Sequence, residues 1–395
     1  MKSKSLVPSV HALSALPEGF RAEWDELAEA APLGTGSLQA SPAWIDATAR
    51  TLSPEAEISL MALRGQDGAL RGVFPLMINK VRRGPTLDTR YAYFDPDRDL
   101  LRERAPTSLA VKQVSSPLSN EIGCLRTVWL SAAEDRALVM RSALSALAGH
   151  PGWSLALFCI DEALARQAAD ALPDGRTSTV SRHFNFRLHG SGYEPWLAGQ
   201  SQKFRQNLRR ADKARAEAGA VVRRHEGREA VMARLADFAG LAERSWKGGP
   251  LPSSTGQDIL VPYAGRQRAF VEHLTRMDGL HPILSTVEHA ESGHLFGAMI
   301  SVVFSGETYT LLMFVEQGLT KMSPGHLLLR DIIEAAPGGI DFNSTASWTE
   351  RYLDGTRDFR NVMGFAPTLS GTALRRGTQA VRTATSLRRA LVHDR

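Results

Sequence analysis

The stretch from Tyr309 to Thr345 constrains the fold more than any other part of this chain. An apolar and aromatic run from Tyr309 to Glu316 has the length and composition of a central strand. A polar break follows, and Ser323 and Pro324 then match the usual start of a helix with an apolar face. Another strand comes next. The pattern predicts a strand–helix–strand unit whose helix start, bearing a glycine, favours a phosphate-bearing ligand.

The same stretch carries a family resemblance. The sequence KMSPGHLLL at 321–329, followed by IDF at 340–342, resembles the C-terminal catalytic domain of GNAT acyltransferases. The branch it resembles includes the cellulose-biosynthesis CelD acetyltransferases and the Fem-type aminoacyltransferases. The likeness extends to SQKFRQNLRRA at 201–211, LQASPAW at 38–44 and GVFPL at 72–76. Such proteins often carry a Tyr-Lys pair after the Asp strand, and 344–351 has none.

Length and resemblance together predict the domain organisation. A chain of 395 residues exceeds the usual size of one core. The resemblance implies an α/β protein of tandem GNAT-like domains, each a mixed, mostly antiparallel sheet flanked by helices. Glycines near 187–192 predict a boundary between an N-terminal GNAT-like domain at 1–186 and a C-terminal catalytic GNAT domain at 187–395. The second domain would end in a basic helix.

Hydrophobic periodicity predicts the individual elements. Turn residues at 65–68 join two strands into a hairpin. The expected strands lie at 58–64, 70–81, 125–130, 153–159, 220–224, 282–289, 294–305 and 308–316, with a tight turn at 305–307. The expected helices lie at 24–30, 42–49, 135–148, 163–171, 194–219, 229–246, 266–277 and 323–335, and 248–262 is a loop.

Composition narrows the class of partner only slightly. The net charge of +5 and pI of about 9.3 suit a phosphorylated cofactor, an anionic acceptor or nucleic acid, and equally suit proteins that bind none of these. The two cysteines lack metal-ligand spacing, and we expect no metal. The first twenty residues make a poor signal peptide, and no run is long enough to cross a membrane. We therefore expect a cytoplasmic protein.

The resemblance implies which residues hold the cofactor, acetyl-CoA or another acyl-CoA. In these relatives a strand, an SPG-type turn and a helix hold the pyrophosphate of the cofactor. The matching positions here are Phe314, Val315, Met322, Ser323, Pro324, Gly325, His326, Leu327 and Asn343. We expect the amides of Ser323, Gly325 and His326 to face the pyrophosphate.

Three residues are candidates for the chemistry. Attack of an amine on a thioester needs a base, donors for the oxyanion and an acid for the leaving thiolate. Glu316, at the end of the strand, is the candidate base or a solvated carboxylate. Tyr352 is the candidate acid or a packing residue. Asp341, with Asn343, closes a strand where ligands of such sheets tend to bind, or else caps a turn.

Basic and aromatic residues suggest where an acceptor would bind. The helix at 201–219 has one apolar face and one basic face. On the resemblance, Lys203 and Arg205 clamp an anionic acceptor, and the alternative is a solvated charged face. Trp246, Tyr263 and Arg266 surround the loop at 248–262, which is a lid or a linker.

The sequence therefore predicts an acyl-CoA-dependent N-acyltransferase, most simply an N-acetyltransferase. It would transfer an acyl group to an amine of a small-molecule or glycan-type acceptor by direct attack on the thioester. Nucleophile elbows, Walker loops and zinc motifs are missing. Two alternatives stay open: a Fem-like aminoacyltransferase that takes its acyl group from charged tRNA, and a catalytically silent GNAT-fold binding protein.

Overall fold

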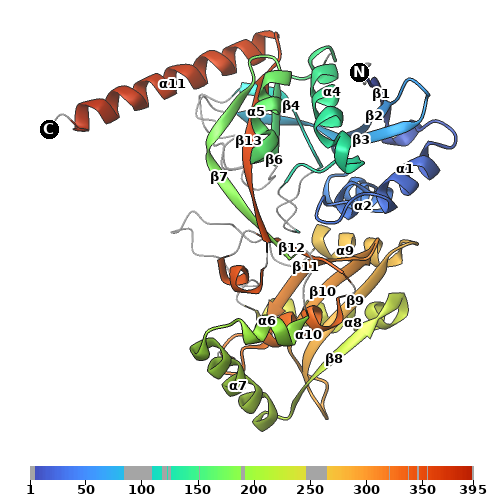
Figure 1. The fold of residues 1–395 in the computed structure, drawn as a ribbon, viewed down its shortest axis with the longest axis vertical. Coiled ribbons are helices and arrows are strands. Elements are labelled where there is room, and N and C mark those ends of the chain that lie inside the picture. The colour runs from blue at the N-terminus through green and yellow to red at the C-terminus, as the bar shows by residue number, and fades with distance from the viewer. Residues whose placement is uncertain are drawn as a thin grey trace.

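The computed structural model describes most of the chain. The described residues are 5–83, 109–117, 122, 126–150, 152–187, 192–245, 265–319, 321–336, 338–344, 347–353 and 355–393. Within them, thirteen strands form one sheet in the order β1-β2-β3-β4-β6-β13-β7-β12-β11-β10-β9-β8, and β5 pairs with β3. In Figure 1 the N-terminal half lies above the C-terminal half, and the sheet runs through both.

The N-terminal half alternates a few long strands with short helices. Its strands are β1 (Val7–Ala12), β2 (Glu57–Arg64), β3 (Leu70–Arg83), β4 (Leu109–Ser115), β5 (Leu130–Ser131), β6 (Leu155–Asp161) and β7 (Arg176–Arg187). Its helices are η1 (Leu13–Ala15), α1 (Phe20–Glu29), η2 (Leu38–Ala40), α2 (Pro42–Ala47), η3 (Thr48–Leu52), η4 (Ala133–Asp135), α4 (Arg136–Ala148) and α5 (Glu162–Ala171).

The C-terminal half has longer helices. These are α6 (Tyr193–Ala198), α7 (Gln202–Glu217), α8 (Gly227–Arg244), α9 (Arg266–Arg276), α10 (Pro324–Ala335), η5 (Ser347–Tyr352) and α11 (Leu369–His393). Its strands are β8 (Ala220–Glu226), β9 (His281–His289), β10 (Leu295–Phe304), β11 (Glu307–Val315), β12 (Ile340–Ser344) and β13 (Gly355–Phe365). Helix α11 runs outward from the top of the molecule (Figure 1).

The two halves repeat one order of elements. The first half runs β1-α1-α2-β2-β3-β4-α4-β6, and the second runs β8-α8-α9-β9-β10-β11-α10-β12. In each half the first four strands pair antiparallel, and the strand after the helix pairs parallel, as β4 with β6 and β11 with β12. This repeat confirms the predicted α/β fold of tandem GNAT-like units.

Strand β13 connects the halves in an unexpected way. It comes from the C-terminal part of the chain, yet it lies between β6 and β7 and pairs antiparallel with both. Val362 pairs with Phe158 on one side and with Thr177 on the other. Strand β7 in turn pairs with β12, which makes the sheet continuous. The boundary after residue 186 stays a prediction.

The halves also share a hydrophobic core. One buried cluster contains Trp24 and Trp44 from the first half together with Phe238, Phe270 and Phe314 from the second. The rings of Trp44 and Phe270 meet edge to face, with 4.9 Å between centroids. Helix α8 therefore packs on one face of the C-terminal part of the sheet, α9 contacts both α8 and α2 of the first half, and α10 packs on the other face with a separate cluster.

Several local predictions need correction. The single helix expected at 194–219 is two helices, because the side chain of Ser201 caps α7 by accepting the Phe204 N–H. The strand expected at 125–130 is reduced to β5, Leu130–Ser131, in the described residues. Strands β1, β4, β7 and β13 were not expected at all. The expected loop at 248–262 lies outside the described residues.

Candidate functional site

Strands β11 and β12 begin as a parallel pair and then separate. Among the described residues their register holds only Thr308 against Ile340 and Tyr309 against Asp341. Both strands continue beyond that second rung without pairing to each other. The region between their unpaired parts is called the β11–β12 wedge below, and its closed end is the Tyr309–Asp341 rung.

A bulge lies in β11 beside the wedge. The register of β11 against β10 shifts between Ile300 and Ser301, which makes Leu311 the extra residue. A bulge leaves its extra residue out of the ladder. Next to it, the Thr310 hydroxyl donates to the Phe342 carbonyl of β12 over 2.8 Å. The main chain of β11 along the wedge is therefore only partly paired with β10.

Helix α10 begins against the outer part of β11. Pro324 takes the first helical position after Ser323, whose φ of 48° is left-handed. A Cβ added to Gly297 of β10 would lie 2.8 Å from the Pro324 Cβ. Glycine at 297 therefore lets the start of α10 sit directly on the sheet, with the positive end of the helix dipole beside the wedge.

Gly325 lies in the first turn of α10, and the fold itself does not require a glycine there. Its φ is outside the left-handed region. A Cβ at this position would meet the Met313 and Val315 side chains of β11 at 3.7 and 3.8 Å, which is ordinary van der Waals contact. Neither the backbone conformation nor the packing of the folded chain therefore explains why residue 325 has no side chain.

Two of the three amides expected to face a ligand are used within the turn. The Ser323 N–H donates to the Leu319 carbonyl, and the His326 N–H donates to the Ser323 carbonyl, each over 3.0 Å. The Gly325 N–H has no main-chain acceptor among the described residues. We therefore revise the expected amide donor to Gly325, and the contacts of Ser323 and His326 with a cofactor stay predictions.

The other predicted cofactor residues fall into two groups. Phe314, Met322 and Leu327 are buried in the two hydrophobic clusters around β11 and α10, so they shape the walls of the wedge. Val315 is half-buried beside Gly325. Asn343 instead binds the first half of the chain: its side chain accepts from Gln39 over 2.9 Å and donates to the Ile122 carbonyl over 3.1 Å.

Tyr352 lies beside the start of α10, as the candidate acid requires. Its hydroxyl is hydrogen-bonded to Nδ1 of His326. Its ring stacks on Trp196 with 5.1 Å between centroids and meets Phe204 edge to face. Burial raises the pKa of Tyr352, which keeps the phenol protonated. Burial, with the charge of Arg351 as a second cause, lowers the pKa of His326.

Glu316 lies at the far end of β11 from the closed end of the wedge. Its carboxylate pairs with Arg244 at 3.0 Å and is hydrogen-bonded to His294 at 3.0 Å. It comes seven positions after Tyr309, which corresponds to about 23 Å along a strand. Its carboxylate lies at the end of α8, where Arg244 is, and its role as a general base stays a prediction.

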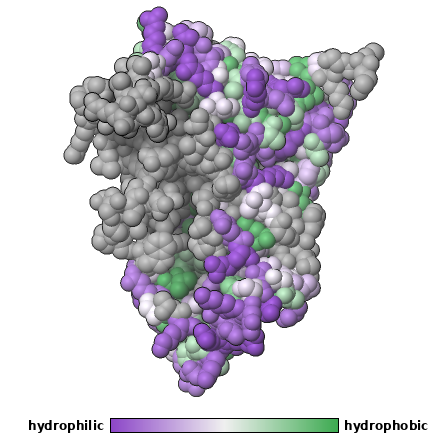
Figure 2. All heavy atoms as spheres, turned by 60° about the vertical axis from the view of Figure 1, so that its left-hand side comes forward, coloured by the Kyte–Doolittle hydropathy of each residue, from purple (hydrophilic) through white to green (hydrophobic). Residues whose placement is uncertain are grey.

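The predicted acceptor residues are scattered. Lys203 is exposed on α7, where the surface at that end of the molecule is mostly hydrophilic (Figure 2). Arg205 instead donates to the Ala198 and Gln200 carbonyls and so caps α6. Arg266 binds the Leu52 carbonyl and pairs with Glu55, which ties α9 to the first half. Trp246 and Tyr263 lie outside the described residues.

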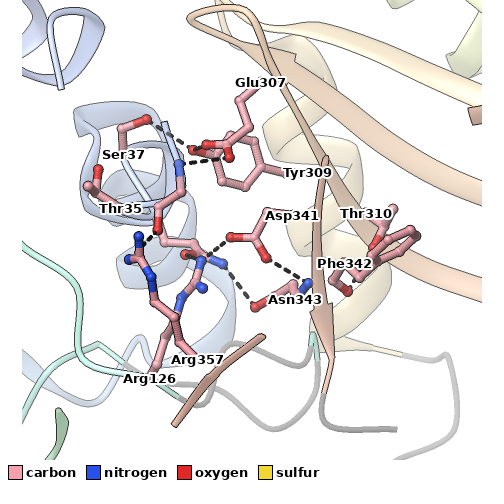
Figure 3. A network of polar contacts seen from close by, with 12 residues as sticks. Thr35, Ser37, Arg126, Glu307, Tyr309, Thr310, Asp341, Phe342, Asn343 and Arg357 are labelled. Atoms are coloured by element: carbon pink, nitrogen blue, oxygen red, sulfur yellow. Dashed lines mark hydrogen bonds and ion pairs between the residues drawn. The ribbon is translucent and has the colours of Figure 1, made fainter. Parts of the chain in front are cut away.

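A buried polar network joins the halves at the closed end of the wedge (Figure 3). Asp341 is fully buried and forms an ion pair with Arg126 of the first half. The Arg126 guanidinium also donates to Gln39 over 3.1 Å, and the Asn343 N–H donates to Asp341 over 2.8 Å. Breaking such a buried pair is costly, so this contact fixes β12 against the first half.

Glu307 and Tyr309 form the second part of the network. The fully buried Glu307 carboxyl accepts the Gly34 N–H over 2.9 Å and the Tyr309 hydroxyl. Ser37 lies 3.0 Å from the Tyr309 oxygen and donates to it, because the Tyr309 proton is directed at Glu307. The Gly34 carbonyl accepts from Arg357. These contacts clamp β11 to the loop before η2.

The ionisation of this cluster is unusual. Burial, and next the negative charge of Asp341, raise the pKa of Glu307 from 4.5 to about 7. Burial and the charge of Glu307 raise the pKa of Tyr309 well above its ordinary value. Glu307 therefore changes charge near neutral pH. Sequence reasoning missed this group because it assigned 305–307 to a turn. The spacing of Glu307 and Tyr309, two residues apart on one strand face, was the available indication.

The equivalent opening in the first half is filled. Val114 and Ala156 form the last rung between β4 and β6. Further along β6, the Thr127 N–H donates to the Cys159 carbonyl over 2.7 Å, and the Cys159 N–H donates to the Thr127 hydroxyl over 2.9 Å. The chain itself thus occupies this edge of β6. The β11–β12 wedge is therefore the better candidate site.

Comparison with known proteins agrees with this geometry. The family model described as an acetyltransferase (GNAT) domain matches residues 202–341, which include β11, α10 and the start of β12. Residues 202–341 are therefore similar to a GNAT domain. GNAT domains form a family of acyltransferases, and the match thus supports transferase activity in general. No curated protein matches the chain significantly in sequence.

Solved structures show the fold. The chain resembles the crystal structure of FemX with a TM-score of 0.53 and 12% identity, covering 86% of this chain and 95% of that one. A tandem GNAT protein from the clavulanic acid biosynthesis pathway aligns with a TM-score of 0.46 and 12% identity, over 92% and 99% of the two chains. L-PGS from Bacillus licheniformis aligns with a TM-score of 0.45 and 13% identity, over 85% of this chain and 96% of that one. The FemX likeness confirms the predicted tandem fold around the GNAT domain.

The described residues offer neither a metal site nor a membrane span. Among them, no group of three or more His, Cys, Asp or Glu side chains could hold a metal ion. No helix in the described part of the chain is both long and apolar enough to cross a membrane.

Proposed function

We propose that this protein is an acyl-CoA-dependent N-acyltransferase whose reaction takes place in the β11–β12 wedge. The start of α10 would hold the pyrophosphate of acyl-CoA, and the wedge would hold the arm that carries the thioester. The acceptor is an amine on a small molecule or glycan precursor, and an acetyl group is the simplest donor group. The reaction would take place in the cytoplasm.

The observation that carries this proposal is Gly325. A helix start with an uncommitted amide attracts an anion. The residue that bears this amide is a glycine although neither backbone conformation nor neighbouring side chains demand one. Close approach of a ligand to the backbone explains the missing side chain. The GNAT match over the same residues supports acyl-CoA as that ligand.

The residues around the wedge suit the chemistry. Acyl-CoA supplies an activated thioester carbonyl. The main chain of β11 at the Leu311 bulge lies where it can donate to the oxyanion that forms during attack. Tyr352 stays protonated beside His326 at the same end of the wedge as α10, which suits a donor to a leaving thiolate. Asp341 holds the closed end of the wedge in place through Arg126.

A pair of substitutions at one position tests the cofactor site. Gly325→Val places a branched side chain over the α10 amide, and affinity for acetyl-CoA should fall by about tenfold or more. Gly325→Ala is the matched control for the fold, because its Cβ fits at ordinary contact distance. Calorimetry with acetyl-CoA measures both variants. Wild-type affinity in a folded Gly325→Val variant would remove the site.

An aminoacyl-tRNA donor is the second candidate. The likeness to FemX in fold and the basic face of α7 favour it. Thermal shifts separate the candidates, because a ligand that binds only the folded state raises Tm by mass action. Acetyl-CoA should raise Tm if our proposal is correct. A rise with charged tRNA alone would favour the second candidate, and no rise with either would favour a binding protein without catalysis.

A further inference from the structure

The buried cluster at the closed end of the wedge contains a proton acceptor that the mechanism above does not use. Glu307 and Tyr309 lie on β11 at or next to the last paired rung, and Ser37 joins them from the first half. All three side chains are buried. A carboxyl, a phenol and a hydroxyl in one hydrogen-bonded row can pass a proton along it.

The position of this row fits the reaction better than that of Glu316. On the proposed function, an acyl-CoA held at α10 would extend its thioester arm away from the helix, toward the narrowing end of the wedge. Tyr309 is part of the rung at that end. Glu316 follows the other end of β11 instead, and its carboxylate is already paired to Arg244 at the end of α8.

We propose that Glu307, acting through the Tyr309 hydroxyl, is the general base that deprotonates the acceptor amine. The inference rests on the proposed function. As the amine nitrogen bonds to the thioester carbon, its proton passes to the Tyr309 oxygen and the Tyr309 proton passes to the Glu307 carboxylate. The carbon–sulfur bond breaks, and the thiolate leaves with the bonding electrons and takes up a proton. Tyr309 is the catalytic residue in contact with the amine, and Glu307 accepts the proton.

The charges around Glu307 make it suitable for this role. Asp341 on β12 opposes its ionisation, while Arg126, the Gly34 N–H and the Tyr309 hydroxyl favour the carboxylate. Arg357 adds positive charge at the Gly34 carbonyl. The resulting pKa of about 7 makes Glu307 half-ionised near neutral pH, which is the range in which a general base works best.

The test is the pH dependence of thioester cleavage. Purified full-length protein is mixed with acetyl-CoA and hydroxylamine, a weakly basic amine probe, and thiol release gives kcat/KM from pH 5.5 to 9. Wild type should lose activity as the pH falls through about 7, because Glu307 becomes protonated. In Glu307→Gln the part of this acidic limb near pH 7 should vanish, leaving only the fall at lower pH that protonation of hydroxylamine itself causes, and the rate at pH 8 should fall by about a hundredfold. The dissociation constant of acetyl-CoA should change less than about twofold, since Glu307 does not contact the cofactor.

Further variants keep the test decisive. Tyr309→Phe retains the buried ring and should give the same loss, which covers the case in which Glu307→Gln folds poorly. Glu316→Gln should keep the acidic limb, and the exposed Glu23→Gln should match wild type. An intact acidic limb in folded Glu307→Gln, or its loss in Glu316→Gln, would overturn the assignment. A wild type that binds no acetyl-CoA would instead refute the proposed function, and this inference with it.

Discussion

Replacing Glu307 by glutamine removes a buried carboxyl whose ionisation opposes folding. Its pKa is raised from 4.5 to about 7 by burial and by Asp341. The folded state therefore holds more protons than the unfolded state between these two pH values, so the free energy of unfolding falls as pH rises through that window. A rise of this size corresponds to a loss of about 3 kcal/mol, complete above pH 7.

Glutamine preserves the contacts while removing the charge. Its amide oxygen can accept the Gly34 N–H, and its NH2 group can donate to the Tyr309 oxygen. Tyr309 then donates to Ser37, which lies 3.0 Å away. We expect the variant to match wild type near pH 4.5 and to exceed it by up to about 3 kcal/mol at pH 8.

Urea unfolding at pH 5, 6, 7 and 8 measures this difference, with Glu23→Gln as an exposed control. The reasoning concerns the slope of stability against pH and not the absolute value at one pH. A difference between Glu307→Gln and wild type that stays constant across the range would refute it, because linkage requires the difference to grow.

Three other substitutions have definite expected outcomes. Gly297→Ala should cost about 1–3 kcal/mol in urea unfolding, because the new Cβ meets Pro324 at 2.8 Å, whereas Gly325→Ala should cost less; equal costs would contradict the packing argument. Arg126→Met should lower the free energy of unfolding by about 3–5 kcal/mol, because it leaves the buried Asp341 carboxylate without its partner. Adding Asp341→Asn to this variant should restore part of the lost stability, which thermal unfolding would measure. Arg205→Ala should cost about 1 kcal/mol through the lost α6 carbonyl contacts, while exposed Lys203→Ala should stay within about 0.5 kcal/mol; the reverse order would favour Arg205 as an acceptor ligand.

Local patterns predicted the second half of the fold well. The expected helix at 323–335 agrees with α10, Pro324–Ala335, because proline, glycine and an apolar face all favour the same start and orientation. The antiparallel strands β9, β10 and β11 were also expected within one residue at most ends. Long apolar runs bounded by turns identify such elements without any knowledge of their partners.

The missed elements depend on distant partners. Strand β13 carries charged and polar residues from Gly355 to Arg360, and it is stabilised by β6 and β7, which lie far away in sequence. Strand β1 lies at one end of the sheet with exposed side chains and has β2 as its neighbour there. Periodicity in one segment cannot reveal such pairing.

The network at the closed end of the wedge was missed for a related reason. Arg126 and Asp341 are 215 residues apart, and neither has a local motif. Ser305 and Gly306 both take left-handed φ values, so the turn is completed in two residues and β11 begins at Glu307. A turn one residue longer, as the sequence suggested, would have left Glu307 out of the strand.

The position of β13 has a consequence for the order in which the protein can be completed during synthesis. Strands β6 and β7 leave the ribosome early, but the strand that belongs between them follows only after the whole second repeat. Until then the nascent first repeat has two strand edges with unsatisfied N–H and C=O groups, which are sites for aggregation. The second repeat can pair its own strands β8 to β12 before that. Strand β13 follows it in the chain and can then pair with the free edges of β6 and β7. Strand β13, Gly355–Phe365, thus decides whether the first half of the chain becomes a folded domain.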